Sequence, residues 1–154
     1  MPILGTRTLH WADESACEAT ARDLAARTAI RDACIELRGA LGAGKTTFAR
    51  HLLRALGVEG RVKSPSYALM EPYRVGGLDA WHFDFYRFDD PHEWEDAGFR
   101  DVFAQPGLKL VEWPERAAGL LPEADLRIAI ELVDETRRRV VFEAGTARGL
   151  ELLG

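Results

Sequence analysis

The stretch Gly39-Ala-Leu-Gly-Ala-Gly-Lys-Thr46 decides the fold, because it matches the phosphate-binding loop pattern G-x-x-x-x-G-K-[ST] without a gap. Residues 33–38 before it form a short apolar run typical of a buried strand. Residues 47–56 after it carry apolar side chains at helical spacing. A strand, a glycine-rich loop and a helix in this order are the context in which the pattern binds phosphate, rather than forming an ordinary turn.

Each part of this loop has a chemical reason. Gly42 and Gly44 allow the backbone to curl so that successive N–H groups face one anion. The helix that follows adds the positive end of its dipole at the same place. We expect Lys45 to reach the outer phosphates of a nucleotide and Thr46 to offer its hydroxyl to a magnesium ion. The loop residues expected to contact the nucleotide are Leu41, Gly42, Ala43, Gly44, Lys45, Thr46 and Thr47.

The bulk composition narrows the class of protein. The 154 residues suit one domain, 1–154, and 47% hydrophobic with 29% charged residues is typical of an ordinary globular protein. The formal net charge of -5 argues against a protein that grips nucleic acid through an overall basic field. No apolar run approaches the roughly 20 residues of a membrane helix, and the first residues lack a secretory signal. We therefore expect a cytoplasmic protein without a membrane partner.

The rest of the chain alternates helix and strand patterns. A first helix is expected from about Asp13 or Ser15 to Thr28, with Ser15 and Glu18 as a capping box, and Cys17 and Cys34 are expected in the core. The other expected elements are a helix ending near Gly57, strands 67–73, 78–86, 108–112, 126–133 and 138–142, a short helix 91–97 after Asp90, and a terminal helical turn within 143–153. This order predicts an α/β fold with a parallel core sheet, antiparallel additions and flanking helices.

Glu112 is the first candidate for the acid that a phosphate loop needs to hold and orient a metal ion and water. It ends the apolar strand 108–112, and open α/β sheets bind ligands at the carboxyl ends of their strands. The alternative is a strand-end carboxylate in a surface ion pair. Trp113 follows directly, so its indole is expected either beside this site or packed at its rim.

Asp84 is the second candidate acid, within His82-Phe-Asp-Phe-Tyr-Arg87. Strand alternation places His82, Asp84 and Tyr86 on one face and the two phenylalanines on the other. Asp84 on such a face either binds metal-bound water or activates an attacking one, or it is simply solvated. His82 is expected to be a packed or hydrogen-bonded residue rather than a metal ligand.

Other polar and aromatic residues carry weaker patterns. Ser64-Pro-Ser-Tyr67 is typical of an ordinary turn, or alternatively of a switch that senses the outer phosphate through magnesium. Exposed aromatics such as Trp94 or Tyr73 are candidate partner contacts, although single exposed aromatics are normal on protein surfaces. Four basic residues either contact the transition state or a partner, or are merely solvated. They are Arg61, Lys63, Arg87 and Arg100.

Five segments, in this order and at suitable spacings, resemble the TsaE (YjeE) family, the bacterial ATPases of tRNA threonylcarbamoyladenosine synthesis. They are Gly39-Ala-Leu-Gly-Ala-Gly-Lys-Thr-Thr47, Val62-Lys-Ser-Pro-Ser-Tyr67, His82-Phe-Asp-Phe-Tyr-Arg87 with Asp90-Pro91, Gly98-Phe-Arg-Asp101 and Val111-Glu-Trp-Pro114. The resemblance covers essentially the whole chain and is far more specific than the loop alone. One departure is Ser66, where the family usually has threonine; the hydroxyl is kept and a stiffening methyl is lost.

The resemblance implies properties that composition and spacing do not show. It implies a cytoplasmic P-loop ATPase with a sheet of mixed direction, using ATP and Mg²⁺. It also implies association with the TsaB–TsaD pair, which transfers a threonylcarbamoyl group, supplied as an adenylate by TsaC-type enzymes, to a tRNA adenosine beside the anticodon. ATP hydrolysis would reset that complex between turnovers, with tRNA engaged only through the complex.

The same resemblance implies roles for individual residues. Lys45 and the loop backbone hold the phosphates, Thr46 and Glu112 hold magnesium, and Asp84 is important for hydrolysis. The residues expected to take part in catalysis are Asp84, Glu112 and Lys45. The positions that match the surroundings of the nucleotide base are Trp11, Asp13 and Arg137.

Two other functions stay open. A small-metabolite kinase uses the same kind of loop, but no glycine-rich lid carrying arginines is apparent in this sequence. A non-catalytic adaptor would support its partner through ATP binding alone. The sequence shows no base-reading motif that separates ATP from GTP.

Overall fold

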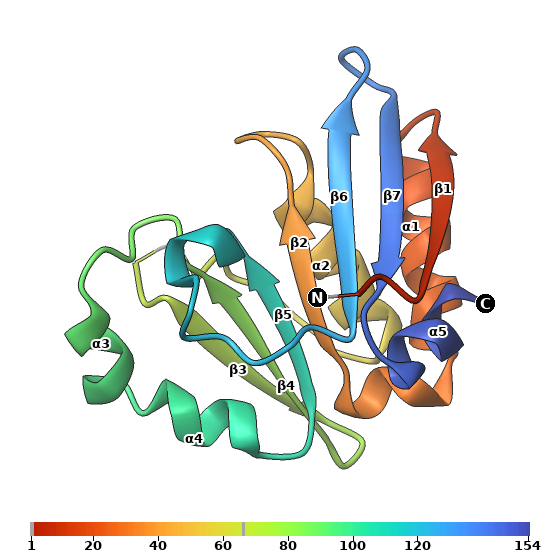
Figure 1. The fold of residues 1–154 in the computed structure, drawn as a ribbon. Helices are drawn as coiled ribbons and strands as arrows, with labels where there is room; N and C mark the ends of the chain where they lie inside the picture. Colours follow the sequence, from red (N-terminus) through yellow and green to blue (C-terminus); the bar gives the residue numbers. More distant parts are fainter. Residues whose placement is uncertain (1, 66) are drawn as a thin grey trace.

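The computed structural model describes residues 2–65 and 67–154, and its strands form a seven-stranded sheet in the order β1-β7-β6-β2-β5-β4-β3 (Figure 1). The strands are β1 Gly5–Trp11, β2 Cys34–Arg38, β3 Met70–Val75, β4 Leu78–Asp84, β5 Leu108–Glu112, β6 Leu126–Leu132 and β7 Arg138–Ala144. The helices are α1 Glu14–Ala25, α2 Lys45–Ala55, α3 Pro91–Asp96, α4 Phe99–Ala104 and α5 Ala147–Leu153, with 3-10 turns η1 Thr28–Asp32 and η2 Pro114–Ala117. Ser66, the departure from the family pattern, lies outside the described residues.

The sheet is mixed, as the sequence predicts. β2 pairs in parallel with β5 and β6, and β4 pairs in parallel with β5, whereas β1, β3 and β7 are antiparallel to their neighbours. This confirms the α/β P-loop fold with a parallel centre and antiparallel additions. Because β2, β4 and β5 run in one direction, their carboxyl ends meet at the same edge, beside the loop that follows β2.

Alternation of side chains divides the core between the two faces of the sheet. Ile35 and Leu37 of β2 join Phe48 and Leu52 of α2 in the larger cluster, which also receives α1. Phe83 of β4 belongs instead to an aromatic cluster that includes residues of α3 and α4. In Figure 1, α1 and α2 lie together behind the sheet, while α3 and α4 lie beside β3 and β4. The main core therefore anchors α2, whose N-terminus lies at the sheet edge.

The first helix begins directly after Asp13, the earlier of its two predicted starts, but its cap differs from the predicted one. Asp13 caps α1, and its Oδ1 accepts a hydrogen bond from the Ala16 N–H at 3.1 Å. The predicted capping box of Ser15 and Glu18 is therefore wrong, because Ser15 falls inside the first turn. An ionised carboxylate two residues earlier is a stronger acceptor for the free N–H groups than a hydroxyl. The helix ends at Ala25, and the chain continues into η1.

Two elements and two residues expected at the surface differ from the expectations. β1 was not expected, because its mostly exposed side chains lack the alternation of a half-buried strand. α4 was not expected either; it starts after Gly98, whose φ of 71° turns the chain out of α3. The predicted exposure of Trp94 and Tyr73 is wrong. Trp94 is 5% exposed within the aromatic cluster, and Tyr73 is half-buried against the main core.

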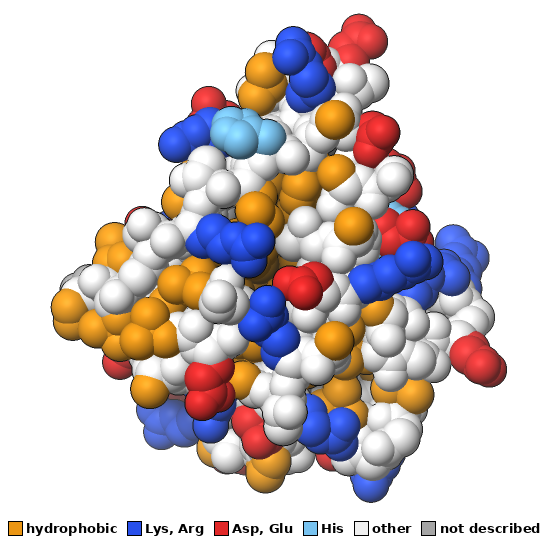
Figure 2. All heavy atoms as spheres, turned by 90° about the vertical axis from the view of Figure 1, so that its right-hand side faces the viewer, with side chains coloured by type: hydrophobic (Ala, Val, Ile, Leu, Met, Phe, Trp, Pro, Cys, Tyr) orange, Lys and Arg blue, Asp and Glu red, His pale blue; other side chains and the backbone are white. Residues whose placement is uncertain are grey.

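The structure also describes the apolarity of the helices, the distribution of surface charge and the environment of the two cysteines. No helix within residues 2–65 and 67–154 combines the length and apolarity needed to cross a lipid bilayer. On the face shown in Figure 2, acidic and basic side chains are interspersed rather than gathered by sign. Cys17 and Cys34 are buried free thiols, and burial raises the pKa of both to about 12, so they act as inert core residues.

Candidate nucleotide-binding site

The loop between β2 and α2 has the backbone that its glycines predict. Gly42 and Gly44 have φ angles of 79° and 112°, in the left-handed region, where a residue with a Cβ is strained. A Cβ at either position would meet no atom within 4 Å. Glycine is therefore needed at these positions for its dihedral angle and not for lack of space. α2 begins at Lys45, directly after the loop, so the free N–H groups of its first turn and its positive dipole end lie at the loop.

Lys45 lies inside the loop with its ammonium group on main-chain carbonyls. Its Nζ donates hydrogen bonds to the carbonyls of Gly39 and Ala40, the latter at 3.1 Å, and lies 3.9 Å from the centroid of the Trp113 ring. Trp113 is therefore beside the site. Burial lowers the pKa of Lys45, and the negative charge of Glu112 opposes that shift. A phosphate oxygen would give this ammonium a charged acceptor, which is stronger than a neutral carbonyl.

The carboxylate of Glu112 joins three elements. Thr46 Oγ1, at the start of α2, lies 2.9 and 3.0 Å from its two oxygens, and His82 Nε2, on β4, lies 2.6 Å from Oε2. Glu112 is 2% exposed, so the alternative of a surface ion pair is wrong. His82 is fully buried and hydrogen-bonded, as the sequence predicts. The arrangement fixes the orientation of the Glu112 carboxylate from two sides.

Asp84 lies opposite Glu112 in the register of β4 and β5. It is buried, so the alternative of a solvated acid is wrong, and its Oδ1 accepts the Tyr86 N–H at 3.0 Å. Burial raises the pKa of Asp84, the Tyr86 amide partly offsets that shift, and Glu112 adds to it. Phe83 packs on the other face of the strand, as alternation predicts. Two carboxylates therefore stand side by side at the sheet edge next to the loop.

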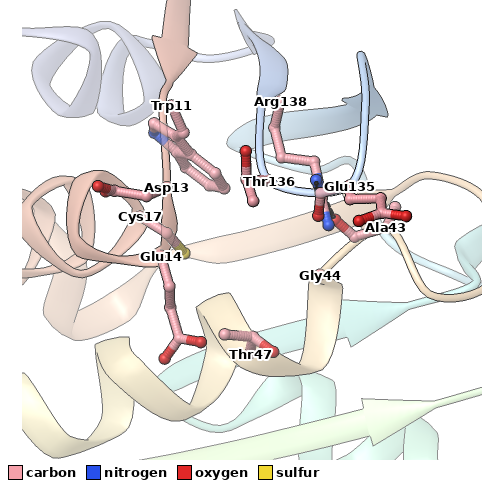
Figure 3. A pocket seen from close by; sticks show the side chains of 10 residues that line it. All are labelled: Trp11, Asp13, Glu14, Cys17, Ala43, Gly44, Thr47, Glu135, Thr136 and Arg138. Atoms are coloured by element: carbon pink, nitrogen blue, oxygen red, sulfur yellow. Dashed lines mark hydrogen bonds between the residues drawn. The ribbon is translucent and has the colours of Figure 1, made fainter.

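Two adjoining cavities open around the loop. The larger, of about 470 Å³, is lined by Leu41, Gly42, Gly44, Lys45, Thr46, Thr47, Ser64, Asp84, Tyr86, Arg87, Glu112 and Trp113. The smaller, of about 240 Å³, is lined by Trp11, Asp13, Glu14, Cys17, Ala43, Gly44, Thr47, Glu135, Thr136 and Arg138 (Figure 3). Gly44 and Thr47 border both cavities, so one elongated ligand can occupy the two across the start of α2.

The three residues expected near the nucleotide base lie differently with respect to the smaller cavity. Trp11 and Asp13 line it, whereas Arg137 does not and instead pairs with Asp134 at 2.6 Å. The next residue, Arg138, borders the cavity and was missed by the sequence analysis (Figure 3). Arg137 lies in the turn before β7, where its guanidinium is engaged by Asp134.

The geometry agrees with comparisons against known proteins. A family model described as "Threonylcarbamoyl adenosine biosynthesis protein TsaE" matches residues 11–140. This chain belongs to the TsaE family. The match includes the phosphate loop, Asp84 and Glu112, so it covers the segments on which the resemblance rests.

Individual TsaE relatives support the assignment. The "tRNA threonylcarbamoyladenosine biosynthesis protein TsaE" of Haemophilus influenzae is 47% identical over 103 residues, which are 67% of this chain and 65% of the relative's length. The protein of the same name from Bacillus subtilis is 37% identical over 110 residues, 71% of this chain and 68% of that one. The crystal structure of Bacillus subtilis YdiB superposes with a TM-score of 0.81 at 26% identity, covering 99% of this chain and 95% of that chain.

Proposed function

We propose that this chain is a magnesium-dependent ATPase that serves tRNA threonylcarbamoyladenosine synthesis. The observation that carries the proposal is the 2.9 Å contact between Thr46 Oγ1 and Glu112 at a phosphate loop. It brings together the loop hydroxyl and the strand-end acid that P-loop enzymes use around a nucleotide-bound metal. Membership of the TsaE family supports the pathway. The proposal treats residues 1–154 as a single ATPase domain.

The residues at this position fit Mg²⁺. Among residues 2–65 and 67–154, no group of three or more His, Cys, Asp or Glu side chains is arranged to hold a metal ion. Mg²⁺ does not need such a cage, because it keeps several waters and binds through one or two protein oxygens plus nucleotide phosphates. Thr46 and Glu112 offer the hard oxygen ligands and would hold the ion. When bound, it supplies positive charge against the β- and γ-phosphates.

The chain's own residues supply the remaining parts of hydrolysis. The loop N–H groups and Lys45 hold the phosphates and neutralise the charge that develops on the γ-phosphoryl oxygens. Asp84, opposite Glu112, orients the attacking water and takes its proton at a carboxylate oxygen. The raised pKa of Asp84 makes its carboxylate a better proton acceptor. Trp113 covers the Lys45 ammonium and limits its contact with water.

The smaller cavity is the proposed place of the nucleoside, with Trp11 and Asp13 in its wall. Trp11 is rigid there, because it stacks on Phe48 at 5.7 Å and its Nε1 donates to Thr20 Oγ1 at 2.9 Å. Arg137 would have to leave Asp134 before it could contact the nucleotide. The choice of ATP over GTP rests on the family resemblance.

We expect the partner of this ATPase to be the TsaB–TsaD complex, in the cytoplasm, with tRNA engaged through that complex. The family assignment supports work with other components of the same pathway, and the choice of TsaB–TsaD rests on the family resemblance. The net charge of -5 also favours indirect contact with tRNA, because the chain has no overall basic field with which to bind phosphates itself.

The proposal is tested with the purified chain, TsaB–TsaD and Mg²⁺-ATP. We expect the chain to copurify with TsaB–TsaD and to release phosphate faster in its presence, and we expect no phosphate release without Mg²⁺. If the purified chain, incubated with Mg²⁺-ATP and cell extract, produced a phosphorylated metabolite, it would be a kinase instead. Full tRNA modification by an Asp84→Ala variant that binds ATP but does not hydrolyse it would indicate a nucleotide-gated adaptor.

A further inference from the structure

We infer that Arg138 is a positioning residue that sets the direction of one peptide unit in the phosphate loop and ties that loop to the β6–β7 turn. The inference rests on the proposed nucleotide binding. It concerns a residue that borders the smaller cavity and contacts the loop from β7, a strand far away in the sequence (Figure 3).

Arg138 contacts backbone carbonyls, although Asp13, Glu14 and Glu135 line the same cavity. Its Nε donates to the carbonyl of Ala43 at 2.8 Å. Its Nη1 donates to the main-chain carbonyls of Asp134, Glu135 and Arg137, at 3.0, 3.3 and 3.1 Å. Within the part of the chain that the structure describes, every hydrogen bond of this guanidinium therefore goes to the backbone. Such contacts hold backbone in place rather than neutralising a carboxylate.

The Ala43 contact fixes a group that would face a phosphate. The peptide between Ala43 and Gly44 is planar and trans, so its C=O and N–H point in opposite directions. Drawing the Ala43 carbonyl toward Arg138 therefore turns the Gly44 N–H away from Arg138. Gly44 borders both cavities, so its N–H is one of the donors available to a bound anion.

This peptide needs an external restraint. Gly44 has a φ of 112° and no Cβ, so its own side chain cannot prevent the peptide from rotating. If the peptide turned over, the Ala43 carbonyl would point toward the phosphate and repel it. The hydrogen bond from Arg138 opposes that rotation with a charged donor, which binds a carbonyl more strongly than a neutral donor does.

The same guanidinium also closes the β6–β7 turn. Asp134 Oδ1 accepts the N–H groups of Thr136 and Arg137 at 3.1 and 2.9 Å, which folds the turn, and Arg138 holds its carbonyls. Glu135 and Thr136 of this turn line the smaller cavity. Arg138 thus links the wall proposed for the nucleoside to a peptide of the phosphate loop, so its loss should weaken both ends of the site.

The inference is tested by comparing Arg138→Ala and Arg138→Lys with Arg139→Ala as the matched control. Arg139 is the next residue of β7, so strand alternation places its side chain on the opposite face from Arg138, and it lies 3.8 Å from Glu131. Calorimetry with Mg²⁺-ATP and with adenosine gives affinities, and amide NMR follows the Gly44 N–H resonance. We expect Arg138→Ala to weaken ATP binding about tenfold or more, with a smaller loss for adenosine and a shifted Gly44 resonance. Arg139→Ala should match the unchanged protein.

The outcomes separate the alternatives. Arg138→Lys keeps the positive charge but has a single nitrogen donor in place of the three of the guanidinium. This variant should remain folded and lose part of the ATP affinity. Arg138 variants with ATP affinity within about twofold of the unchanged protein would overturn the inference. Equal losses for ATP and adenosine with an unmoved Gly44 resonance would also overturn it, because they indicate a general loss of stability. Failure of the unchanged protein to bind ATP would instead refute the proposed function.

Discussion

His82 Nε2 lies 2.6 Å from Glu112 Oε2, and both side chains are buried. An ionised carboxylate only accepts hydrogen bonds, so the hydrogen lies on Nε2 of the imidazole. Nδ1 is buried and has no hydrogen-bond partner among the described residues, so Glu112 is the polar contact that orients this ring. The acid proposed to hold magnesium is thus supported from the neighbouring strand as well as by Thr46.

Removing this support should impair the site without unfolding the protein. We expect His82→Ala to lower ATP hydrolysis about 10- to 100-fold and to raise the Mg²⁺ concentration needed for half-maximal rate, as for other residues that orient a metal ligand. His82→Gln, which retains a donor, should lose less. His92→Ala, at an exposed histidine of α3, is the control. An unchanged Mg²⁺ requirement in His82→Ala would contradict this role.

The hydroxyl of Thr46 should matter more than its methyl group. Thr46→Ala removes the oxygen that lies 2.9 Å from Glu112, and we expect Mg²⁺-ATP binding to weaken by about 1.5–3 kcal/mol. Thr46→Ser keeps the oxygen and should bind within a few tenths of a kcal/mol of the unchanged protein. Titration calorimetry with and without Mg²⁺ measures both. Equal affinities in the two variants would count against a metal contact at this position.

Lys45 should be needed for binding but not for folding. Burial lowers the pKa of Lys45, so the charged form is less favourable in the folded protein than in the unfolded chain. Lys45→Met should therefore keep or raise the melting temperature while weakening ATP binding by about 1.5–3 kcal/mol. Lys63→Met, at an exposed lysine, is the matched control. A Lys45→Met protein that melts earlier and binds ATP normally would show that the lysine is structural.

Asp84 combines a catalytic and a stability effect of opposite sign. We expect Asp84→Asn to lower kcat about 100-fold or more with a small change in KM, because proton transfer acts in the transition state. The raised pKa means that the contribution of this carboxyl to stability is fully present below its ordinary pKa of 3.8 and is lost as pH rises through the raised value. Asp84→Asn should therefore be more stable than the unchanged protein at neutral pH.

Urea unfolding at several pH values checks the sign of that effect. The stability difference between Asp84→Asn and the unchanged protein should shrink as pH falls toward 3.8. A variant that is less stable at neutral pH, or a difference that grows on acidification, would contradict the raised pKa. Asp79→Asn, at a half-exposed acid of the same strand, is the control.

The sequence predicted those parts of the site that depend on neighbours in the chain. The phosphate loop follows from glycine dihedral angles, and Asp84 and Glu112 follow from strand alternation and strand ends. β1 could not be predicted, because its side chains are mostly exposed and pairing with the distant β7 fixes it. The contact of His82 with Glu112 depends on the register between β4 and β5, which no local pattern encodes. The contact of Arg138 with Ala43 likewise joins segments far apart in the sequence.

Gly39 and Gly42 of the loop should differ in their sensitivity to substitution. At Gly39, with a φ of 150°, a Cβ would lie 2.5 Å from the Ile130 carbonyl oxygen, whereas Gly42 has open space and only an unfavourable φ. We expect Gly42→Ala to lower the free energy of unfolding by about 1–2 kcal/mol. Gly39→Ala should lower it distinctly more, because the loop must also move away from β6. Gly60→Ala, with a φ of 78° and open space outside the site, controls for the dihedral angle alone. Denaturant unfolding gives the order, and a Gly39→Ala protein as stable as Gly60→Ala would show that the loop is not packed against β6.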